Sequence, residues 1–277
     1  MIALVTALVL GSAVASAAPD ACQRMDDGYI IGPVGGALLD GSAGAAGRVC
    51  PRNSFGVSAG AYALIDTPNF YGHILANGNV SASMVFGEST EVFGELELMR
   101  YDSVISAVAS TYTGFGHTTV GVRQLMFTEA YTAIALHSRL VLPTAFALYD
   151  GNSPMVLDVG GSVRYEVTPL FHVRGHLSVL SSGNVGKGAT DFRLGLNPTF
   201  GAEWRAGKAF GMGLDVANGF GYDAIYDHTA VALGFRFSDG KRFGSELALR
   251  KPLAGRERAL ATLELSFRVR LGELPES

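Results

Sequence analysis

Histidine and serine are the residues of this sequence best suited to acid–base or nucleophilic chemistry, and their spacing predicts no catalytic site. His137 and Ser138 are adjacent, so in an extended chain their side chains point in opposite directions. His172 and His176 share a face, but their spacing in a strand places them about 13 Å apart, too far to share one metal ion. The one Gly-x-Ser-x-Gly match, Gly56 to Gly60, lies inside the alternating stretch 54–66 rather than in a turn from a strand into a helix, so it does not predict a nucleophile elbow. We therefore expect no catalytic residue, no metal site and no cofactor, and we expect the histidines to form hydrogen bonds.

Charged and apolar residues alternate along most of the chain from Ser54 onward. Glu95 and Glu97, for example, alternate with Leu96 and Leu98. A period of two residues predicts β-strands with one polar and one apolar face. We expect twelve strands, most of them longer than the ~9–11 residues that cross a bilayer obliquely: 54–66, 78–87, 91–101, 116–127, 131–142, 155–167, 170–180, 190–205, 209–217, 227–237, 242–251 and 259–271.

The connections between these strands alternate in length. Those after the even-numbered strands have about 2–4 residues, as tight hairpins do. Those after the odd-numbered strands have about 7–14 residues, more than a hairpin needs. The stretch 183–188, rich in glycine, is interpreted as a flexible turn in one of the long connections. A soluble β-sandwich has no reason to sort its loops in this way.

The composition agrees with strands that face lipid. Glycine accounts for 36 of the 277 residues, about twice the usual ~7%, and there is no Gly-X-Y repeat. Hydrophobic residues make up 48% and charged residues 17%, which is too apolar for a disordered chain. The net charge of −4 and the pI near 5.9 argue against nucleic acid as a partner.

Residues 1–17 have the features of a secretory signal peptide. Ile2 to Leu10 is an apolar run, and Ala15-Ser16-Ala17 fits the small-x-small rule for cleavage. Export leads to an oxidising compartment, where a pair of cysteines is usually bridged. We therefore expect Cys22 and Cys50 to form a disulfide, the alternative being two free thiols. Both lie in a Gly- and Ala-rich segment, 18–53.

The alternating strands, the sorted loops and the signal peptide together resemble those of a bacterial outer-membrane β-barrel. The resemblance covers residues 54–271 and rests on pattern rather than on a family motif. It implies an all-β fold, a transmembrane up-and-down antiparallel β-barrel of about 12 strands in the Gram-negative cell envelope, with both termini in the periplasm. It also implies outer-membrane lipid and the barrel-assembly machinery as partners. Segment 18–53 is expected to be periplasmic or a plug, and residues 272–277 form a C-terminal tail.

The polar faces of the strands are expected to line the lumen of the barrel. Acids and arginines are balanced there, which indicates either ion pairs that cross-link the interior or a narrow pore without strong ion selectivity. In the alternative, many of these residues lie at solvated rims. The lumen-lining residues that we expect are Glu95, Glu97, Arg123, Arg139, Asp158, Arg164, Glu166, His172, Arg174, His176, Arg193, Asp215, Arg236, Glu264 and Arg268.

These features favour a non-enzymatic, narrow channel or porin for small solutes. One alternative is an outer-membrane hydrolase of the lipase or protease type with a site at the outer rim. It requires a histidine within hydrogen-bond reach of a serine or aspartate on a neighbouring strand. The other alternative is a closed structural or surface-interaction barrel, which requires a lumen occluded by arginine–carboxylate pairs. The sequence does not fix the solute or the oligomeric state.

Overall fold

The structure is a computed structural model. It describes residue 22 and residues 49–66, 71–105, 110–142, 144, 152–186, 193–207, 209–218, 220, 229–238, 243–253 and 259–270. Thirteen strands follow one another in these parts of the chain: β1 (Ser54–Asp66), β2 (Tyr71–Phe86), β3 (Thr90–Ile105), β4 (Ser110–Gly114), β5 (Thr118–Thr128), β6 (Thr132–Leu142), β7 (Asn152–Thr168), β8 (Phe171–Gly186), β9 (Arg193–Ala206), β10 (Phe210–Asn218), β11 (Thr229–Ser238), β12 (Phe243–Pro252) and β13 (Ala259–Arg270).

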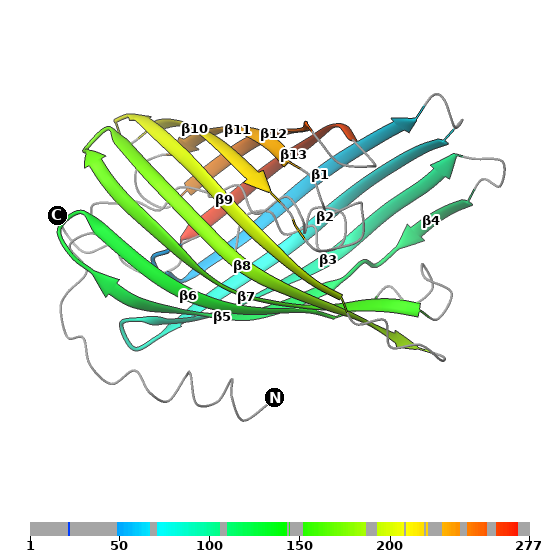
Figure 1. Ribbon diagram of the computed structural model, residues 1–277, viewed down its shortest axis with the longest axis horizontal. Coiled ribbons are helices and arrows are strands. Elements are labelled where there is room, and N and C mark those ends of the chain that lie inside the picture. The colour runs from blue at the N-terminus through cyan, green and yellow to red at the C-terminus, as the bar shows by residue number, and fades with distance from the viewer. Residues whose placement is uncertain are drawn as a thin grey trace.

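All strands pair with antiparallel neighbours, and the pairing order follows the chain. It runs from β2 through β1 to β13 and then back along the chain to β5 and β3, and β2 also pairs with β3. Apart from β4, each strand therefore has a hydrogen-bonded neighbour on both edges. Figure 1 shows the strands wound obliquely around a barrel. This confirms the expected up-and-down antiparallel barrel.

The thirteenth strand is a continuation of β5 rather than an extra member of the ring. Leu96 of β3 pairs with Thr118 of β5, and Arg100 pairs with Gly114 of β4, which is one continuous register. Between them the Glu97 and His117 backbones stay paired, with an N–O distance of 3.0 Å. At this break the Glu97 side chain occupies the space where a Cβ at Gly116 would lie. The expected strand at 116–127 thus has an outlying portion, β4, that the alternation does not predict.

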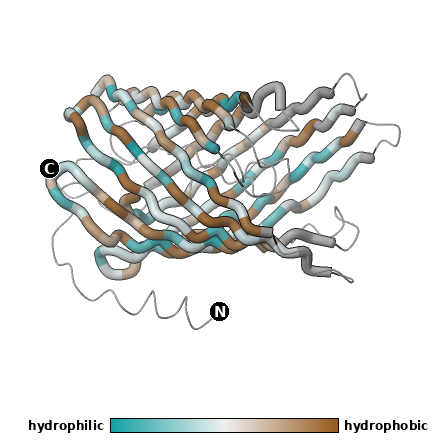
Figure 2. The backbone as a smooth tube through the Cα atoms, in the orientation of Figure 1, coloured by the Kyte–Doolittle hydropathy of each residue, from teal (hydrophilic) through white to brown (hydrophobic). Residues whose placement is uncertain are grey.

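The two faces of each strand differ in the way expected of a barrel in lipid. Large apolar side chains such as Phe200, Met84 and Leu177 are exposed on the outer face, whereas many charged side chains are buried on the inner face. Water-soluble proteins show the opposite arrangement. Figure 2 shows the resulting alternation of hydropathy along the strands. In the described residues, no helix combines the length and apolarity needed to cross a membrane.

Several strands extend beyond their predicted ends. β2 begins at Tyr71 rather than at residue 78, and β3 continues to Ile105. β8 continues to Gly186, so the interpretation of residues 183–186 as a flexible turn is wrong. At the end of β8 the apolar signal fades, because small and polar residues such as Ser181 and Gly183 follow one another. Hydrogen bonding to a neighbouring strand, which the sequence does not display, extends the structure there.

Short turns lie at one end of the barrel, here called the short-turn end. Residues 87–89, 129–131 and 169–170 form three of them, and Gly207 and Ala209 lie in another, between β9 and β10. Gly87 and Gly207 have φ angles of 65° and 73°, a left-handed conformation that glycine adopts without steric cost. The first residue of β1 and the last residue of β13 are paired, Ser54 with Arg270, so both ends of the ring lie beside these turns.

Candidate functional site

The inner face of the barrel is the candidate site because it holds most of the buried charge. Of the expected lumen-lining residues, Glu97, Arg123, Arg139, Asp158, Arg164, Glu166, His172, Arg174, His176 and Asp215 are buried. Glu95 and Arg236 are partly buried. The side chains of Arg193, Glu264 and Arg268 lie outside the described residues, although their backbones belong to β9 and β13. Buried polar groups that lie so densely must satisfy one another.

Glu203 of β9 is the centre of the largest ionic cluster. The Arg205 Nε donates to its Oε1 at 2.8 Å and the Arg164 Nη2 to its Oε2 at 3.2 Å. Arg174 and Arg236 lie at 3.5 and 3.7 Å from the same carboxylate. The Nη2 atom of Arg164 also lies 2.8 Å from the His172 Nδ1. One carboxylate thereby links β7, β8, β9 and β11 across the interior.

A second pair crosses a whole strand. The Arg174 guanidinium on β8 binds the Asp215 carboxylate on β10 through two hydrogen bonds, and its Nε–Oδ1 distance is 2.8 Å. Gly201 of β9 lies directly between the two, opposite Arg174 on one side and Asp215 on the other. A Cβ at this position would overlap the Asp215 carboxylate. The absence of a side chain at Gly201 therefore leaves space for the bidentate pair to form. Two parallel hydrogen bonds are the strongest geometry for an arginine–carboxylate pair.

Two further pairs join neighbouring strands. Arg123 of β5 donates to Glu91 of β3 at 2.7 Å, and its guanidinium lies 5.1 Å from the centre of the Phe93 ring. Arg139 of β6 donates to Asp158 of β7, also at 2.7 Å. All four charged side chains are almost completely buried. Ion pairs this deeply buried leave little of their charge for solvent or for a passing ion.

Sequence reasoning missed Arg100 and Asp102. The register of β2 and β3 shifts at Gly78, where Met99 and Glu97 face consecutive residues of β2. Leu98 and Met99 are consequently both exposed, and the residues that follow change face. Arg100 then lies 3.4 Å from Glu97 and 3.3 Å from Asp102, all buried. Two consecutive apolar residues in an otherwise alternating strand were the available signal of this β-bulge.

The arrangement that the hydrolase alternative requires is partly present. The Ser162 Oγ on β7 lies 2.8 Å from the His176 Nδ1 on β8. However, the carboxylate of Asp158 lies beside a different histidine, with 3.7 Å between its Oδ1 and the His137 Nε2. The two histidine rings stack with 5.0 Å between their centroids. Ser162 and His176 are both buried within the wall rather than placed at the outer rim.

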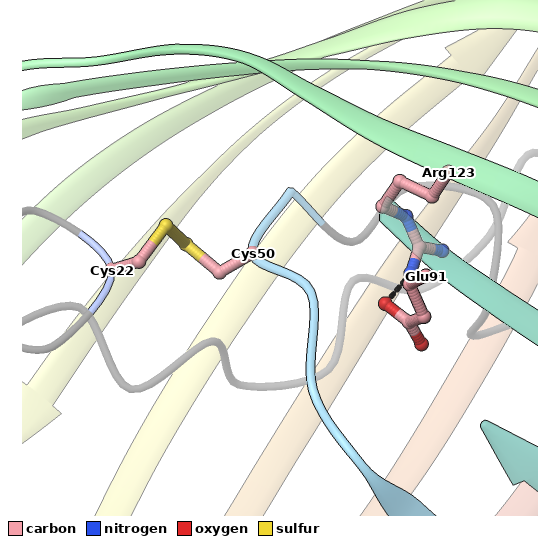
Figure 3. Close-up of a disulfide and its surroundings, with 4 residues drawn as sticks. All are labelled: Cys22, Cys50, Glu91 and Arg123. Atoms are coloured by element: carbon pink, nitrogen blue, oxygen red, sulfur yellow. Dashed lines mark hydrogen bonds and ion pairs between the residues drawn. A yellow bond between two sulfur atoms is a disulfide. The ribbon is translucent and has the colours of Figure 1, made fainter. Parts of the chain in front are cut away.

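The expected disulfide joins Cys22 to Cys50, and it lies next to the inner face of β6. Val49 and Cys50 pack against Ala133 and Ala135, and Cys22 lies against the same cluster. These two alanines are on the face of β6 that also carries His137 and Arg139. Figure 3 shows the disulfide with the Glu91–Arg123 pair in its surroundings.

Residues 49–53 connect this disulfide to β2 at the short-turn end. The Ser83 Oγ donates to the Arg52 carbonyl at 2.7 Å, and the Val85 backbone N–H donates to the Asn53 Oδ1, also at 2.7 Å. Residues 52 and 53 therefore contact β2, whereas residues 49 and 50 contact β6. The ring order places β3 and β5 between these strands, so this segment, called the strap below, spans β3 and β5 on the inner side of the barrel.

Comparisons with known proteins identify the fold. The sequence matches no protein-family model and no curated protein. Among solved structures, an outer-membrane channel from Pseudomonas putida F1 matches with a TM-score of 0.63 and 10% identity, over 82% of this chain and 98% of that one. The fold is that of a bacterial outer-membrane β-barrel. The barrel also resembles the β domain of the Bordetella autotransporter BrkA, with a TM-score of 0.54, 12% identity and coverage of 79% and 100%. A structure of the KdgM porin matches with a TM-score of 0.50, 9% identity and coverage of 79% and 99%.

Proposed function

We propose that this protein is an outer-membrane channel that passes small solutes through a narrow, polar lumen. The observation that carries the proposal is the buried ionic lining, from the Glu203 cluster to the Arg139–Asp158 pair. A buried ion pair stabilises a fold little compared with apolar packing of the same volume. Ionisable groups at membrane depth commonly line pathways for polar solutes. The likeness to channel and porin folds supports the same function.

The proposed location is the outer membrane, with outer-membrane lipid against the exposed apolar face. Export would use residues 1–17 as a cleaved signal peptide, and the barrel-assembly machinery would insert the strands. Both termini would then be periplasmic, as the pairing of Ser54 with Arg270 beside the short turns favours. No enzymatic step is part of this proposal.

Segment 18–53 is proposed to act as a plug at the short-turn end. The strap supports this, because residues 49 and 50 pack inside the barrel against Ala133 and Ala135. Val49 is fully buried there, and Cys50 nearly so. The disulfide to Cys22 fixes the strap to residues further towards the N-terminus. A plug held in this way narrows the conduit without a change in the barrel wall.

The proposal is tested by swelling of vesicles that contain the purified, refolded chain. Iso-osmotic solutions of neutral solutes of increasing size are added, and the swelling rate is followed by light scattering. A narrow channel predicts rapid swelling with the smallest solutes and a steep fall with size. Equal rates for vesicles with and without folded protein would contradict the channel.

The same measurement addresses a second candidate, a closed structural barrel. Ion pairs such as Arg123–Glu91, with both side chains at 0% exposure, favour this candidate because they join neighbouring strands and exclude solvent. It predicts no solute entry, and it also predicts that removal of the strap leaves the barrel impermeable.

A further inference from the structure

A patch of neutral polar side chains lies on the inner face among the ion pairs. It consists of His137 of β6, His176 and Ser178 of β8, and Asn197 and Thr199 of β9. Ser178 is paired directly with Asn197 and His176 with Thr199, and the His137 ring stacks on that of His176. All five side chains are buried. None of them carries a permanent charge.

These side chains have polar atoms that nothing in the described structure satisfies. The atoms are the His137 Nδ1, the His176 Nε2, the Ser178 Oγ, the Asn197 Nδ2 and the Thr199 Oγ1. A buried donor or acceptor without a hydrogen bond is destabilising, and such groups are normally paired. Leu180 on the same face of β8 shows that this wall accepts apolar residues. A group of adjacent unsatisfied atoms therefore indicates a place where a polar ligand binds.

Gly160 of β7 lies in the middle of this patch, opposite His137 on β6 and opposite Ser178 on β8. A Cβ at position 160 would come within 2.5 Å of the Leu177 carbonyl oxygen and within 2.6 Å of the Ser178 Cβ. The absence of a side chain here therefore lets β7 and β8 approach closely at the patch.

The chemistry of the patch selects against ions. On one side Asp158 is engaged by Arg139, and on the other Asp215 is engaged by Arg174. An ion therefore meets charges that are already paired. A hydroxyl group both donates and accepts, which matches a set that combines N–H, O–H and ring nitrogen atoms.

We propose that this patch binds neutral polyhydroxylated solutes, such as a polyol or a monosaccharide, as they pass along the lumen. The inference rests on the proposed channel function and specifies its solute class. It assigns His137, His176, Ser178, Asn197 and Thr199 as the residues that recognise hydroxyl groups.

The test uses the full chain in vesicles, with xylitol as the neutral probe and glutarate as a charged probe of similar size. Wild type is expected to admit xylitol faster than glutarate. The Ser178→Ala/Asn197→Ala variant is expected to lose xylitol uptake by about 5- to 30-fold, as the loss of two hydrogen bonds implies. Its potassium chloride conductance should stay within about twofold of wild type, because the ion pairs are intact. Thr119→Ala, a buried inner-face residue of β5 outside the patch, is the matched control and should behave as wild type.

Equal uptake of xylitol and glutarate by wild type would overturn the inference, as would unchanged xylitol uptake in the double variant. If folded wild type passes no solute, the channel proposal fails. Binding is then measured alone, as the shift that xylitol causes in the denaturant midpoint of unfolding. A shift in wild type that the double variant lacks supports the patch, and no shift in wild type overturns it.

Discussion

Gly201→Ala is the substitution whose outcome follows most directly from the geometry of the lumen. In most strand positions, replacing glycine by alanine stabilises a protein by about 0.5–1 kcal/mol, because the unfolded chain loses freedom. At position 201 the new Cβ would overlap the Asp215 carboxylate and lie 2.9 Å from the Leu214 carbonyl oxygen. Asp215 must then move away from Arg174, whose contact with Glu203 is longer, at 3.5 Å.

Breaking a buried ion pair costs about 3–5 kcal/mol. After the backbone gain is subtracted, we expect Gly201→Ala to lower the free energy of unfolding by about 2–4 kcal/mol. Gly244→Ala on the inner face of β12 is the matched control. Its Cβ would meet only the Phe237 carbonyl oxygen, at 3.9 Å, so the substitution should be neutral or slightly stabilising.

The assay is urea unfolding of the barrel in phospholipid vesicles, followed by tryptophan emission. Trp204 is the only tryptophan, and its side chain is exposed on the outer face, where lipid would surround it. Its emission should shift to the red when the barrel unfolds into water. The reasoning is refuted if Gly201→Ala is as stable as wild type, or if Gly244→Ala is destabilised to the same extent.

Three further predictions concern single contacts. Arg123→Met leaves the Glu91 carboxylate buried without its 2.7 Å contact and should destabilise the barrel by about 3–5 kcal/mol in the same unfolding assay, whereas Arg123→Met/Glu91→Gln should cost about 1 kcal/mol or less. A double variant that costs the sum of the two single changes would contradict this coupling. Cys22→Ser/Cys50→Ser should raise the rate of vesicle swelling, and a thiol reductant should do the same to wild type. An unchanged rate in both cases argues against the plug. Wild type and Ser162→Ala should both hydrolyse a short-chain nitrophenyl ester no faster than lipid without protein does. Wild-type hydrolysis that this substitution abolishes would establish the hydrolase instead, with Ser162 and His176 at its centre.

The period of two residues was sufficient to predict the kind of fold. Alternation assigns each side chain to one of two faces without knowledge of the neighbouring strand. It also separates strands from turns wherever the outer face is strongly apolar, as at Phe55 and Val57 in β1, whose bounds match the prediction. It failed where the outer face becomes small and polar, as at the end of β8.

The ionic contacts could not be predicted because they depend on register between strands. Glu203 meets Arg164 and Arg236 from β7 and β11, neither of which pairs with β9. The Arg174–Asp215 pair depends on the absence of a side chain at Gly201, a residue that composition alone presents as one glycine among many. The bulge at Leu98 and Met99 reverses the face of everything after it in β3, which places Arg100 in the interior.

Single-channel recording in planar lipid bilayers tests the central claim, a polar conduit through the barrel, most directly. The refolded full chain should give discrete current steps in potassium chloride. Because the buried charged side chains of the described residues comprise seven arginines and seven carboxylic acids, the reversal potential in a salt gradient should lie close to zero. A bilayer that contains folded protein, as judged by Trp204 emission, and shows no steps above the lipid background would contradict the channel.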